Sequence, residues 1–304
     1  MYDVIIIGAG PAGYTAGIYC SRARHDTLLI SGILPGGQLM NTTDVENYPG
    51  FSDGIMGPDL MTVMRKQTEK MGTKIVDDEV TSVDFKTKPL KVKTASEEFD
   101  AKAVIVCTGA NPRKIGLDGE QTFAGKGVSY CATCDGAFFK DQELIVVGGG
   151  DSAMEEATFL TKFASTVHII HRREEFRASK IMQERALANE KIKVHFNCIV
   201  KDIQGDQKFQ KVILNNIKTN KDEVLEAGGL FVAIGHEPNS SMFQGQLELD
   251  ENGYVIIKNN TETSVPGVFC AGDVHDHRYR QAVTAAGFGC MAAIDVDKYL
   301  AESN

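Results

Sequence analysis

The chain of 304 residues contains no tryptophan, and phenylalanine and tyrosine together make up only 8% of it. Because proteins often hold single-stranded nucleic acids by stacking bases on aromatic rings, this sequence offers little for that purpose. Basic residues are also outnumbered, with 32 Lys and Arg against 41 Asp and Glu, a net charge of −9. An acidic chain repels the phosphate backbone. We therefore expect no nucleic-acid partner.

Long hydrophobic runs are absent as well, since no apolar stretch approaches the roughly 18 residues of a membrane span. Residues 1–7 lack the basic segment and the cleavage site of a signal peptide, and their apolar pattern predicts a strand. We therefore expect a cytoplasmic protein with no membrane partner. Its length corresponds to two domains of about 150 residues each.

The seven cysteines are an odd number, and only Cys131 and Cys134 lie close together in the sequence. Structural zinc requires four ligands, and no second Cys pair or Cys/His pair accompanies this one. The spacing therefore favours redox chemistry over a zinc site or purely structural thiols, and we expect no metal. Asp135 follows the pair directly and is placed to move a proton. We expect the other five cysteines to be small buried apolar residues.

Glycine, by contrast, is abundant, with 30 residues. Two segments, residues 4–13 and 144–153, share one pattern: an apolar run of strand length, then Gly-x-Gly-x-x-Gly or Ala, then an Ala-rich stretch. In this pattern the first glycine permits a tight turn, the second lets the backbone approach a pyrophosphate, and the third lets helix and strand pack closely. The sequence therefore predicts an α/β fold with two Rossmann-like nucleotide-binding domains. The residues at these positions are Gly8, Gly10 and Gly13, and Gly148, Gly150 and Ala153.

A second pair of similar strands, residues 103–109 and 229–235, supports the duplication. A further strand at 267–273 and a helical pattern from 281 to 300 have no glycine motif of their own, so they should complete one of the earlier domains. We therefore expect the second domain to be inserted within the first. The links should lie near Pro112–Gly116 and Phe243–Gly245. This division gives one discontinuous domain, 1–113 and 246–304, around an inserted domain, 114–245.

The two domains differ where a ribose should bind. A carboxylate usually follows the second strand of such a domain, but after the strand at 27–30 the chain continues with Ser31 and Gly32. In the second domain the corresponding strand is followed by Arg172, Arg173 and Arg177. Arginine side chains pair with phosphate through two hydrogen bonds. The pattern therefore favours NADP(H) over NAD(H), and the alternative is a solvated charged turn.

Taken in order, the segments GAGPAG, GGQL, VENYPG, CATCDG, GGGDSA, HRR with FRA, LFVAIGHEPN, GVFCAGDV and YRQAVTAAG closely resemble those of bacterial low-molecular-weight thioredoxin reductases. The resemblance covers essentially the whole chain. It implies a flavoprotein with FAD in the discontinuous domain and NADPH in the inserted domain, which also carries the redox-active CxxC. The family's substrate is thioredoxin, and its members are homodimers. Ala137 stands where some relatives have a Phe beside the aromatic pair Phe138 and Phe139.

The resemblance also implies which residues contact the cofactors. The expected FAD contacts are Gly8, Gly10, Gly13, Ser31, Gly32, Ile33, Leu34, Pro35, Gly36, Gly37, Gln38, Asn47, Asp273, Val274, His275, Asp276, His277, Arg278, Tyr279, Arg280, Gln281 and Ala282. The expected NADPH contacts are Gly148, Gly149, Gly150, Asp151, Ser152, Ala153, Arg172, Arg173 and Arg177.

Electrons should then pass from NADPH to FAD, to a Cys131–Cys134 disulfide and finally to thioredoxin. Asp135 is the expected acid–base residue, and which cysteine faces the flavin stays open. Because CxxC and the NADPH motif share one domain, the family rotates that domain between half-reactions. Two rival classes differ in sequence: a flavin-dependent ferredoxin reductase lacks the cysteine pair, and a flavin sensor needs neither that pair nor the arginines.

Overall fold

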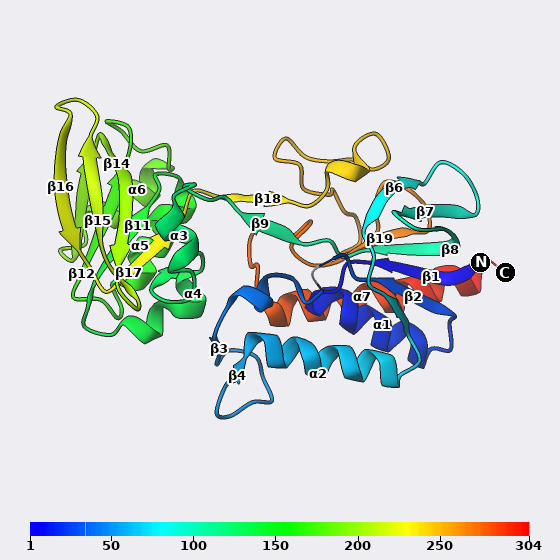
Figure 1. The fold of residues 1–304 in the computed structure, drawn as a ribbon. Coiled ribbons are helices and arrows are strands. Elements are labelled where there is room, and N and C mark those ends of the chain that lie inside the picture. Colours follow the sequence, from blue (N-terminus) through cyan, green and yellow to red (C-terminus); the bar gives the residue numbers. More distant parts are fainter. Residues whose placement is uncertain (34, 304) are drawn as a thin grey trace. The chain divides into compact units, whose positions relative to one another are not determined.

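The computed structural model describes residues 1–33 and 35–303 and divides into two compact units (Figure 1). The outer unit consists of residues 1–111 and 237–304, and the inserted unit of residues 112–236. No helix in the described part of the chain has both the length and the apolar character needed to cross a membrane.

The outer unit is built on a seven-stranded sheet with the order β5-β2-β1-β8-β7-β6, in which β19 also pairs with β8. Strands β1, β2, β5, β8 and β19 are mutually parallel, whereas β6 and β7 form an antiparallel extension. The seven strands are β1 (Tyr2–Ile7), β2 (Thr27–Ile30), β5 (Lys74–Val76), β6 (Val80–Asp84), β7 (Leu90–Thr94), β8 (Glu98–Val106) and β19 (Val268–Cys270).

Three long helices cover one face of this sheet (Figure 1). They are α1 (Pro11–Arg22), α2 (Gly57–Lys70) and α7 (Ala282–Glu302). The remaining short elements of the unit are η1 (Gly37–Asn41), β3 (Asp44–Val45), β4 (Ile55–Met56) and η3 (Ser241–Phe243).

The continuous apolar run of β1 is explained by burial on both faces of the sheet. Val4 and Ile6 pack with the helices, whereas Ile5 and Ile7 pack with the residues on the opposite face. A strand covered on both sides has no solvent face, so polar residues do not alternate along it.

The chain crosses between the units at β9 (Ala110–Pro112) and β18 (His236–Pro238), which pair as a two-stranded sheet. The second crossing lies between residues 236 and 237, earlier than the expected boundary at 245/246. The reason is Phe243, which the glycine-based argument had placed in a link. Its side chain is fully buried in the core of the outer unit and stacks on Phe85, with ring centroids 6.1 Å apart.

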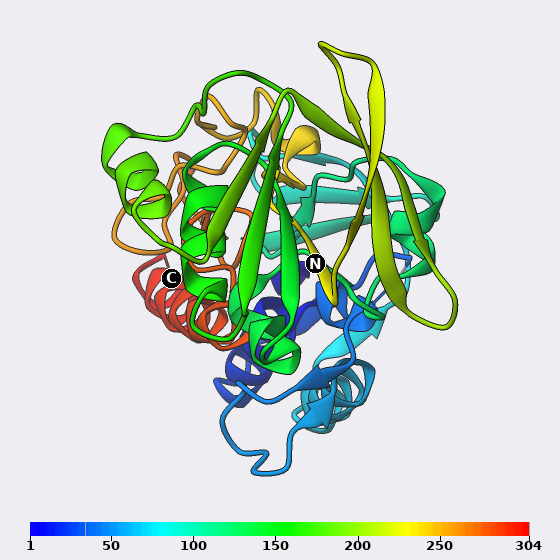
Figure 2. The same cartoon turned by 90° about the vertical axis from the view of Figure 1, so that its left-hand side faces the viewer.

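The inserted unit contains a five-stranded parallel sheet with the order β10-β17-β11-β12-β13. A three-stranded antiparallel sheet, β14-β15-β16, packs on one face of it. Figure 2 shows these antiparallel strands beside the parallel ones. The strands are β10 (Val128–Ser129), β11 (Glu143–Val147), β12 (Thr166–His171), β13 (Ile192–Phe196), β14 (Cys198–Gly205), β15 (Phe209–Asn216), β16 (Lys221–Glu226) and β17 (Gly229–Val232).

Helices cover the other face of the parallel sheet. Leu144 and Val146 of β11 pack with them, while Ile145 between these two residues packs with the antiparallel strands. The helices of the unit are α3 (Asp118–Thr122), α4 (Ala132–Asp135), η2 (Gly136–Phe139), α5 (Asp151–Leu160) and α6 (Lys180–Leu187).

Replacing Phe243 with Ala should destabilise the outer unit by about 3–5 kcal/mol, because a large buried ring leaves a cavity. Urea unfolding followed by circular dichroism measures the loss. The neighbouring exposed residue provides the control, and Gln244→Ala should change the unfolding free energy by less than about 0.5 kcal/mol. Equal stability of both variants would mean that Phe243 is not part of this core.

Candidate active site

Cys131 and Cys134 form a disulfide, with 5.3 Å between their Cα atoms. Cys131 is the N-cap of α4 in an extended conformation, and its Sγ accepts a hydrogen bond of 3.2 Å from the backbone N–H of Cys134. One turn of helix thus brings the two sulfurs together. Both side chains are partly exposed, so a partner can reach the disulfide.

Asp135 is the last residue of α4, directly after the disulfide. Its Oδ2 lies 2.6 Å from the Oγ of the buried Ser129, which donates a hydrogen bond to it. Burial raises the pKa of the Asp135 carboxyl, and the bond from Ser129 works in the opposite direction. Asp135 therefore binds a proton at higher pH than an exposed aspartate. Ser129 was missed by the sequence reasoning, since a lone serine two positions before a cysteine carries no signal.

Four of the other five cysteines are buried, as expected: Cys20, Cys107, Cys198 and Cys270. Burial raises the pKa of the Cys20 thiol to about 12, so it stays protonated and unreactive at neutral pH. The expectation was wrong for the fifth, Cys290, which is partly exposed on α7. It lies on a helix face that the inside of the unit does not fully cover.

The first glycine motif brings backbone atoms together too closely for side chains. A Cβ on Gly8 would lie 2.3 Å from the carbonyl oxygen of Cys107, and a Cβ on Gly13 would lie 1.9 Å from that of Gly8. A Cβ on Gly10, in contrast, would meet no atom within 4 Å. Gly10 is the N-cap of α1 and has no side chain that could cap the helix. The N–H groups in the first turn of α1 therefore face open space, where they can bind an anion.

Gly36 and Gly37, in the loop before η1, lie against this motif. The N–H of Gly36 donates to the carbonyl oxygen of Ala9, and a Cβ on Gly37 would lie 3.5 Å from the Cα of Gly10. Gln38 donates a 2.7 Å hydrogen bond to the side chain of Asn111. Leu34, which was among the expected contacts, lies outside the described residues.

A carboxylate does stand beside the end of β2, but another strand supplies it. Asp77 follows β5, the parallel neighbour of β2, and accepts a 2.7 Å hydrogen bond from Ser31. Arg65 of α2 binds both oxygens of Asp77, at 2.8 and 2.9 Å, and its guanidinium lowers the pKa of that carboxyl. The sequence reasoning missed both residues because it searched only the strand that follows α1.

The segment between β19 and α7 holds the remaining predicted FAD contacts, Asp273 to Ala282. Burial raises the pKa of Asp273 to about 7, and its buried Oδ1 has no hydrogen-bond partner among the described residues. Asp276 has the opposite surroundings, since its carboxylate accepts hydrogen bonds from the backbone N–H groups of the three residues Arg278, Tyr279 and Arg280.

Asn47 also reaches this segment, with its Nδ2 3.4 Å from the Oε1 of Gln281 at the N-terminus of α7. The Nε2 of His275 is buried without a partner in the described chain, and burial lowers the pKa of this ring to about 4. The ring packs edge-on against Phe288, with centroids 4.4 Å apart. The His275 ring is therefore uncharged at neutral pH.

The second glycine motif repeats the geometry of the first. A Cβ on Gly148 would lie 2.4 Å from the carbonyl oxygen of Ala233, and one on Gly150, the N-cap of α5, would meet nothing within 4 Å. Gly149 is covered by the ring of His171, which leaves no room for a Cβ. Asp151 accepts hydrogen bonds from the N–H and the hydroxyl of Ser179 and so ties the following loop to the motif. Ser152 is partly buried beside it.

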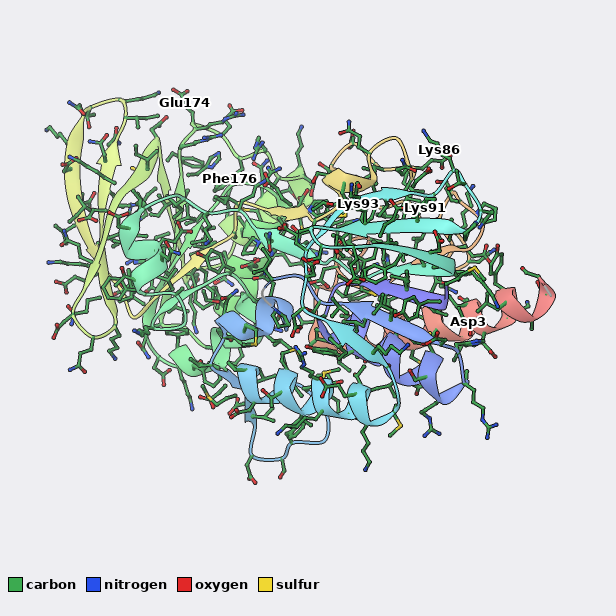
Figure 3. The ribbon with its side chains drawn as sticks, turned by 45° about the vertical axis from the view of Figure 1, so that its right-hand side comes forward. Asp3, Lys86, Lys91, Lys93, Glu174 and Phe176 are labelled. Atoms are coloured by element: carbon green, nitrogen blue, oxygen red, sulfur yellow. A yellow bond between two sulfur atoms is a disulfide. The ribbon has the colours of Figure 1, made fainter. Side chains whose placement is uncertain are left out.

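Arg172, Arg173 and Arg177 are exposed on the turn after β12, and in the part of the chain described here none of them forms an ion pair with an acidic side chain. The backbone N–H of Arg177 donates to the carbonyl oxygen of Gly149, which brings the turn next to the motif. The turn is anchored by the buried Phe176, while Glu174 lies exposed at its rim (Figure 3). Three cations without acidic partners suit a phosphate.

The predicted FAD contacts that are described thus gather in the outer unit, and the predicted NADPH contacts and the cysteine pair lie in the inserted unit. Each unit fits the nucleotide expected for it, because each glycine motif has a Gly that faces open space at a helix N-terminus. Among the described residues, a buried carboxylate oxygen of the outer unit has no hydrogen-bond partner, and three arginines of the inserted unit form no ion pair with an acidic side chain. Across residues 1–33 and 35–303, no three His, Cys, Asp or Glu side chains are arranged to hold a metal.

Residues 2–289 match the family described as pyridine nucleotide-disulphide oxidoreductase. The chain belongs to this family. It is 55% identical over 303 residues to a thioredoxin reductase of Streptomyces clavuligerus, covering 98% of this chain and 94% of that protein. It is 49% identical to NADPH-dependent thioredoxin reductase 3 of Arabidopsis thaliana, covering 99% of this chain but 59% of that protein. Among solved structures, a thioredoxin reductase from Giardia duodenalis has a TM-score of 0.95 at 44% identity, covering 99% of both chains.

These comparisons confirm two sequence-based predictions, the α/β fold and the resemblance to thioredoxin reductases. The Cys131–Cys134 disulfide agrees with membership of a disulphide oxidoreductase family. They do not address individual cofactor contacts, which stay predictions supported by the geometry above.

The carboxyl of Asp273 should make the flavin-free protein less stable as pH rises. Its folded pKa of about 7 lies above the ordinary value of 3.8, so between these values the folded state holds a proton that the unfolded state has lost. Stability is therefore lost as pH rises through this window. We expect Asp273→Asn to be more stable than the unsubstituted protein at about pH 8, by up to about 4 kcal/mol, and to show no such advantage at about pH 4.

Urea unfolding of flavin-free protein at both pH values checks this expectation. Asp276→Asn is the matched control: it replaces a buried carboxylate that accepts three backbone N–H groups, so it should destabilise the protein at about pH 8. A pH dependence that Asp273→Asn leaves unaltered would contradict the assignment.

Proposed function

We propose that this chain is an NADPH-dependent thioredoxin-disulfide reductase that passes electrons from NADPH through FAD and the Cys131–Cys134 disulfide to oxidised thioredoxin. Membership of the pyridine nucleotide-disulphide oxidoreductase family and the NADPH-dependent relative imply FAD and NADPH as cofactors. The relatives named thioredoxin reductase imply thioredoxin as the substrate. The observation that carries the proposal is the partly exposed disulfide beside the half-buried carboxyl of Asp135, in the unit with the arginine-flanked glycine motif.

FAD, when bound, takes up the hydride of NADPH and passes the electron pair to the disulfide. In the outer unit, the N-terminus of α1 and the adjoining loop at 35–38 would hold its pyrophosphate. Asp273, whose buried Oδ1 has no partner among the described residues, would accept a hydrogen bond from a hydroxyl group of FAD. The N-terminus of α7 would direct its positive end toward negative charge. These are the FAD contacts that the sequence analysis expects, and the geometry of the outer unit supports them.

NADPH would bind with its pyrophosphate at the N-terminus of α5 and its 2′-phosphate among Arg172, Arg173 and Arg177. The open space at Gly150 supports the first contact, and the exposed arginines support the second. NADH has only a hydroxyl at the 2′ position, so it gains nothing from the cations.

The cysteine pair performs thiol–disulfide exchange. Two electrons open the Cys131–Cys134 bond, and the two sulfurs take up protons. One thiol then loses its proton and attacks a sulfur of the thioredoxin disulfide, which forms a mixed disulfide and releases the other substrate sulfur as a thiolate that becomes protonated. The second thiol, deprotonated in turn, attacks the mixed disulfide, so the internal disulfide forms again and reduced thioredoxin leaves. Asp135 is the proposed group that gives and takes these protons.

Because the cysteine pair and the NADPH motif share the inserted unit, we propose that this unit rotates between half-reactions so that each reaches the flavin in turn. The paired strands β9 and β18 would act as the hinge, because the chain crosses between the units only there.

Of the two adjacent aromatic residues, we propose that Phe138 contacts thioredoxin. Its ring is exposed, whereas Phe139 packs edge-on against Phe231 with centroids 5.4 Å apart. An exposed aromatic ring near the disulfide can be buried against a protein substrate and so strengthen its binding.

We further propose a homodimer that forms through α7 and α1. Val283, Met291 and Ile294 are exposed on α7, and Tyr19 is exposed on α1. The spacing of the three α7 residues places them along one side of the helix. A line of exposed apolar residues favours a protein contact.

The proposed location is the cytoplasm. Five cysteines are free thiols, four of them buried. Free thiols persist in a reducing compartment.

Replacing either Cys131 or Cys134 with Ser should abolish thioredoxin reduction, because no internal disulfide can form, yet NADPH should still bleach the flavin absorbance. Stopped-flow absorbance measures the flavin step, and a coupled thioredoxin assay measures turnover. Cys198→Ala, which removes a buried thiol of the same unit, should keep both. If a serine variant turned over thioredoxin at a near-normal rate, the relay would be wrong.

The double change Arg172→Ala with Arg173→Ala should raise the Michaelis constant for NADPH roughly 10²–10³-fold, because two charge-assisted contacts are lost. The constant for NADH should stay nearly the same, and so should kcat, since the adenosine end is remote from the hydride. Steady-state kinetics with both nucleotides makes the comparison. Arg185→Ala, an exposed arginine of α6, should alter neither. Equal losses with the two nucleotides would show that these arginines serve another purpose.

A further inference from the structure

Ser129, the last residue of β10, places its hydroxyl among three polar atoms. The Oγ lies 2.6 Å from Oδ2 of Asp135, 3.0 Å from the backbone N of Cys131 and 3.4 Å from the carbonyl oxygen of Cys131. The side chain is buried, so water does not replace these partners. One hydroxyl therefore connects the backbone of Cys131 with the carboxyl of Asp135.

A serine hydroxyl has one proton to donate and two lone pairs with which to accept. The N–H of Cys131 occupies one lone pair. When Asp135 is ionised, the hydroxyl of Ser129 donates its proton to Oδ2. When Asp135 is protonated, the carboxyl O–H can donate to the second lone pair of Ser129, whose own proton then turns to the carbonyl oxygen of Cys131. Every buried polar atom in the set keeps a partner in either state.

We propose that Ser129 is a positioning residue that keeps Asp135 hydrogen-bonded in both protonation states while Asp135 exchanges protons with the cysteine pair. The proton leaves the Asp135 carboxyl for a cysteine sulfur when the disulfide opens, and returns to it when a thiol is deprotonated for attack. This inference rests on the proposed function, since it gives Asp135 the acid–base role. It adds the Ser129 hydroxyl as the group that keeps the Asp135 carboxyl hydrogen-bonded while the charge of that carboxyl changes.

The titratable groups around Asp135 leave the role of its hydrogen-bond partner to Ser129. Helix α5, which packs on α4, carries the acids Asp151, Glu155 and Glu156, and η2 carries no titratable side chain. Tyr130 lies between Ser129 and Cys131, but its hydroxyl lies 3.2 Å from Glu120. Burial and the Ser129 hydroxyl are what shift the pKa of Asp135. Removing the hydroxyl should leave burial alone and raise that pKa further.

The first test follows the carboxyl itself in the flavin-loaded, oxidised enzyme. Infrared difference spectra with isotope-labelled aspartate, with Asp135→Asn used to assign the band, give the pKa of Asp135 directly. Ser129→Ala should raise it by about one pH unit, the worth of one hydrogen bond to a charged group, whereas Ser129→Thr, which keeps a hydroxyl, should stay near the unsubstituted value. Ser240→Ala, a buried serine of the outer unit that bonds a backbone carbonyl, should have no effect. An unchanged pKa in Ser129→Ala would overturn the proposal.

The second test is a double-mutant cycle on the reduction of thioredoxin in single-turnover experiments across pH. Ser129→Ala should slow the step about tenfold near neutral pH and move its pH profile to higher pH by the shift seen in the infrared titration. In the Asp135→Asn background, the same change should have no further effect, because the serine acts through the carboxyl. Effects that multiply in the double variant would mean that Ser129 acts on Cys131 alone and would overturn the proposal.

The two tests separate this inference from the function on which it rests. If Asp135→Asn reduced thioredoxin normally, the acid–base role of Asp135 would fail and the inference with it, while the relay through Cys131 and Cys134 would stand on its own variants. If Asp135→Asn were slow but Ser129→Ala kept the normal pH profile, only the role of Ser129 would be wrong.

Discussion

The close approach of a glycine to the carbonyl oxygen at the end of a neighbouring strand is the constraint on which both units depend. Gly8 meets Cys107 in this way, and Gly148 meets Ala233, at distances that leave no space for a Cβ. The chain can therefore turn directly from a central strand into a helix at the carboxyl edge of the sheet. Because the turn is this tight, the helix N-terminus begins beside open space, where its N–H groups can meet an anion.

The same scaffold serves different chemistry in the two units because different segments surround the turn. In the outer unit, residues 35–38 and the segment after β19 lie next to it, and that segment brings Asp273 and the start of α7. In the inserted unit, the turn after β12 brings three arginines. The cysteine pair enters from β10, at the edge of the same sheet. We therefore propose nucleotide binding for both units and exchange with a protein disulfide for the inserted unit.

The carboxyls of Asp135 and Asp273 differ from those of two other aspartates in how far bonded partners compensate for their burial. Burial raises the pKa values of Asp135 and Asp273, whereas Arg65 lowers the pKa of Asp77, and Asp276 accepts hydrogen bonds from backbone N–H groups. A carboxyl that is easily protonated suits proton transfer or a bond to a ligand, and a fully bonded one suits a structural role. The partners of these aspartates, and not their positions in the sequence, therefore set the proposed functional pair apart from the other two.

The sequence by itself determined the local features of this protein: the two apolar strands with their glycine motifs, the CxxC pair with Asp135, and the arginine turn. Each of these features consists of residues that are neighbours along the chain. The tertiary structure decided what depends on residues far apart or on burial. Phe243 joins the outer core because it reaches Phe85, Asp77 stands beside Ser31 because β5 pairs with β2, and Cys290 stays partly exposed because α7 turns that side outward. Ser129 and Asp135 are only six residues apart, but the pattern of residue types does not show that the chain turns from β10 into α4 so that these two side chains come within 2.6 Å.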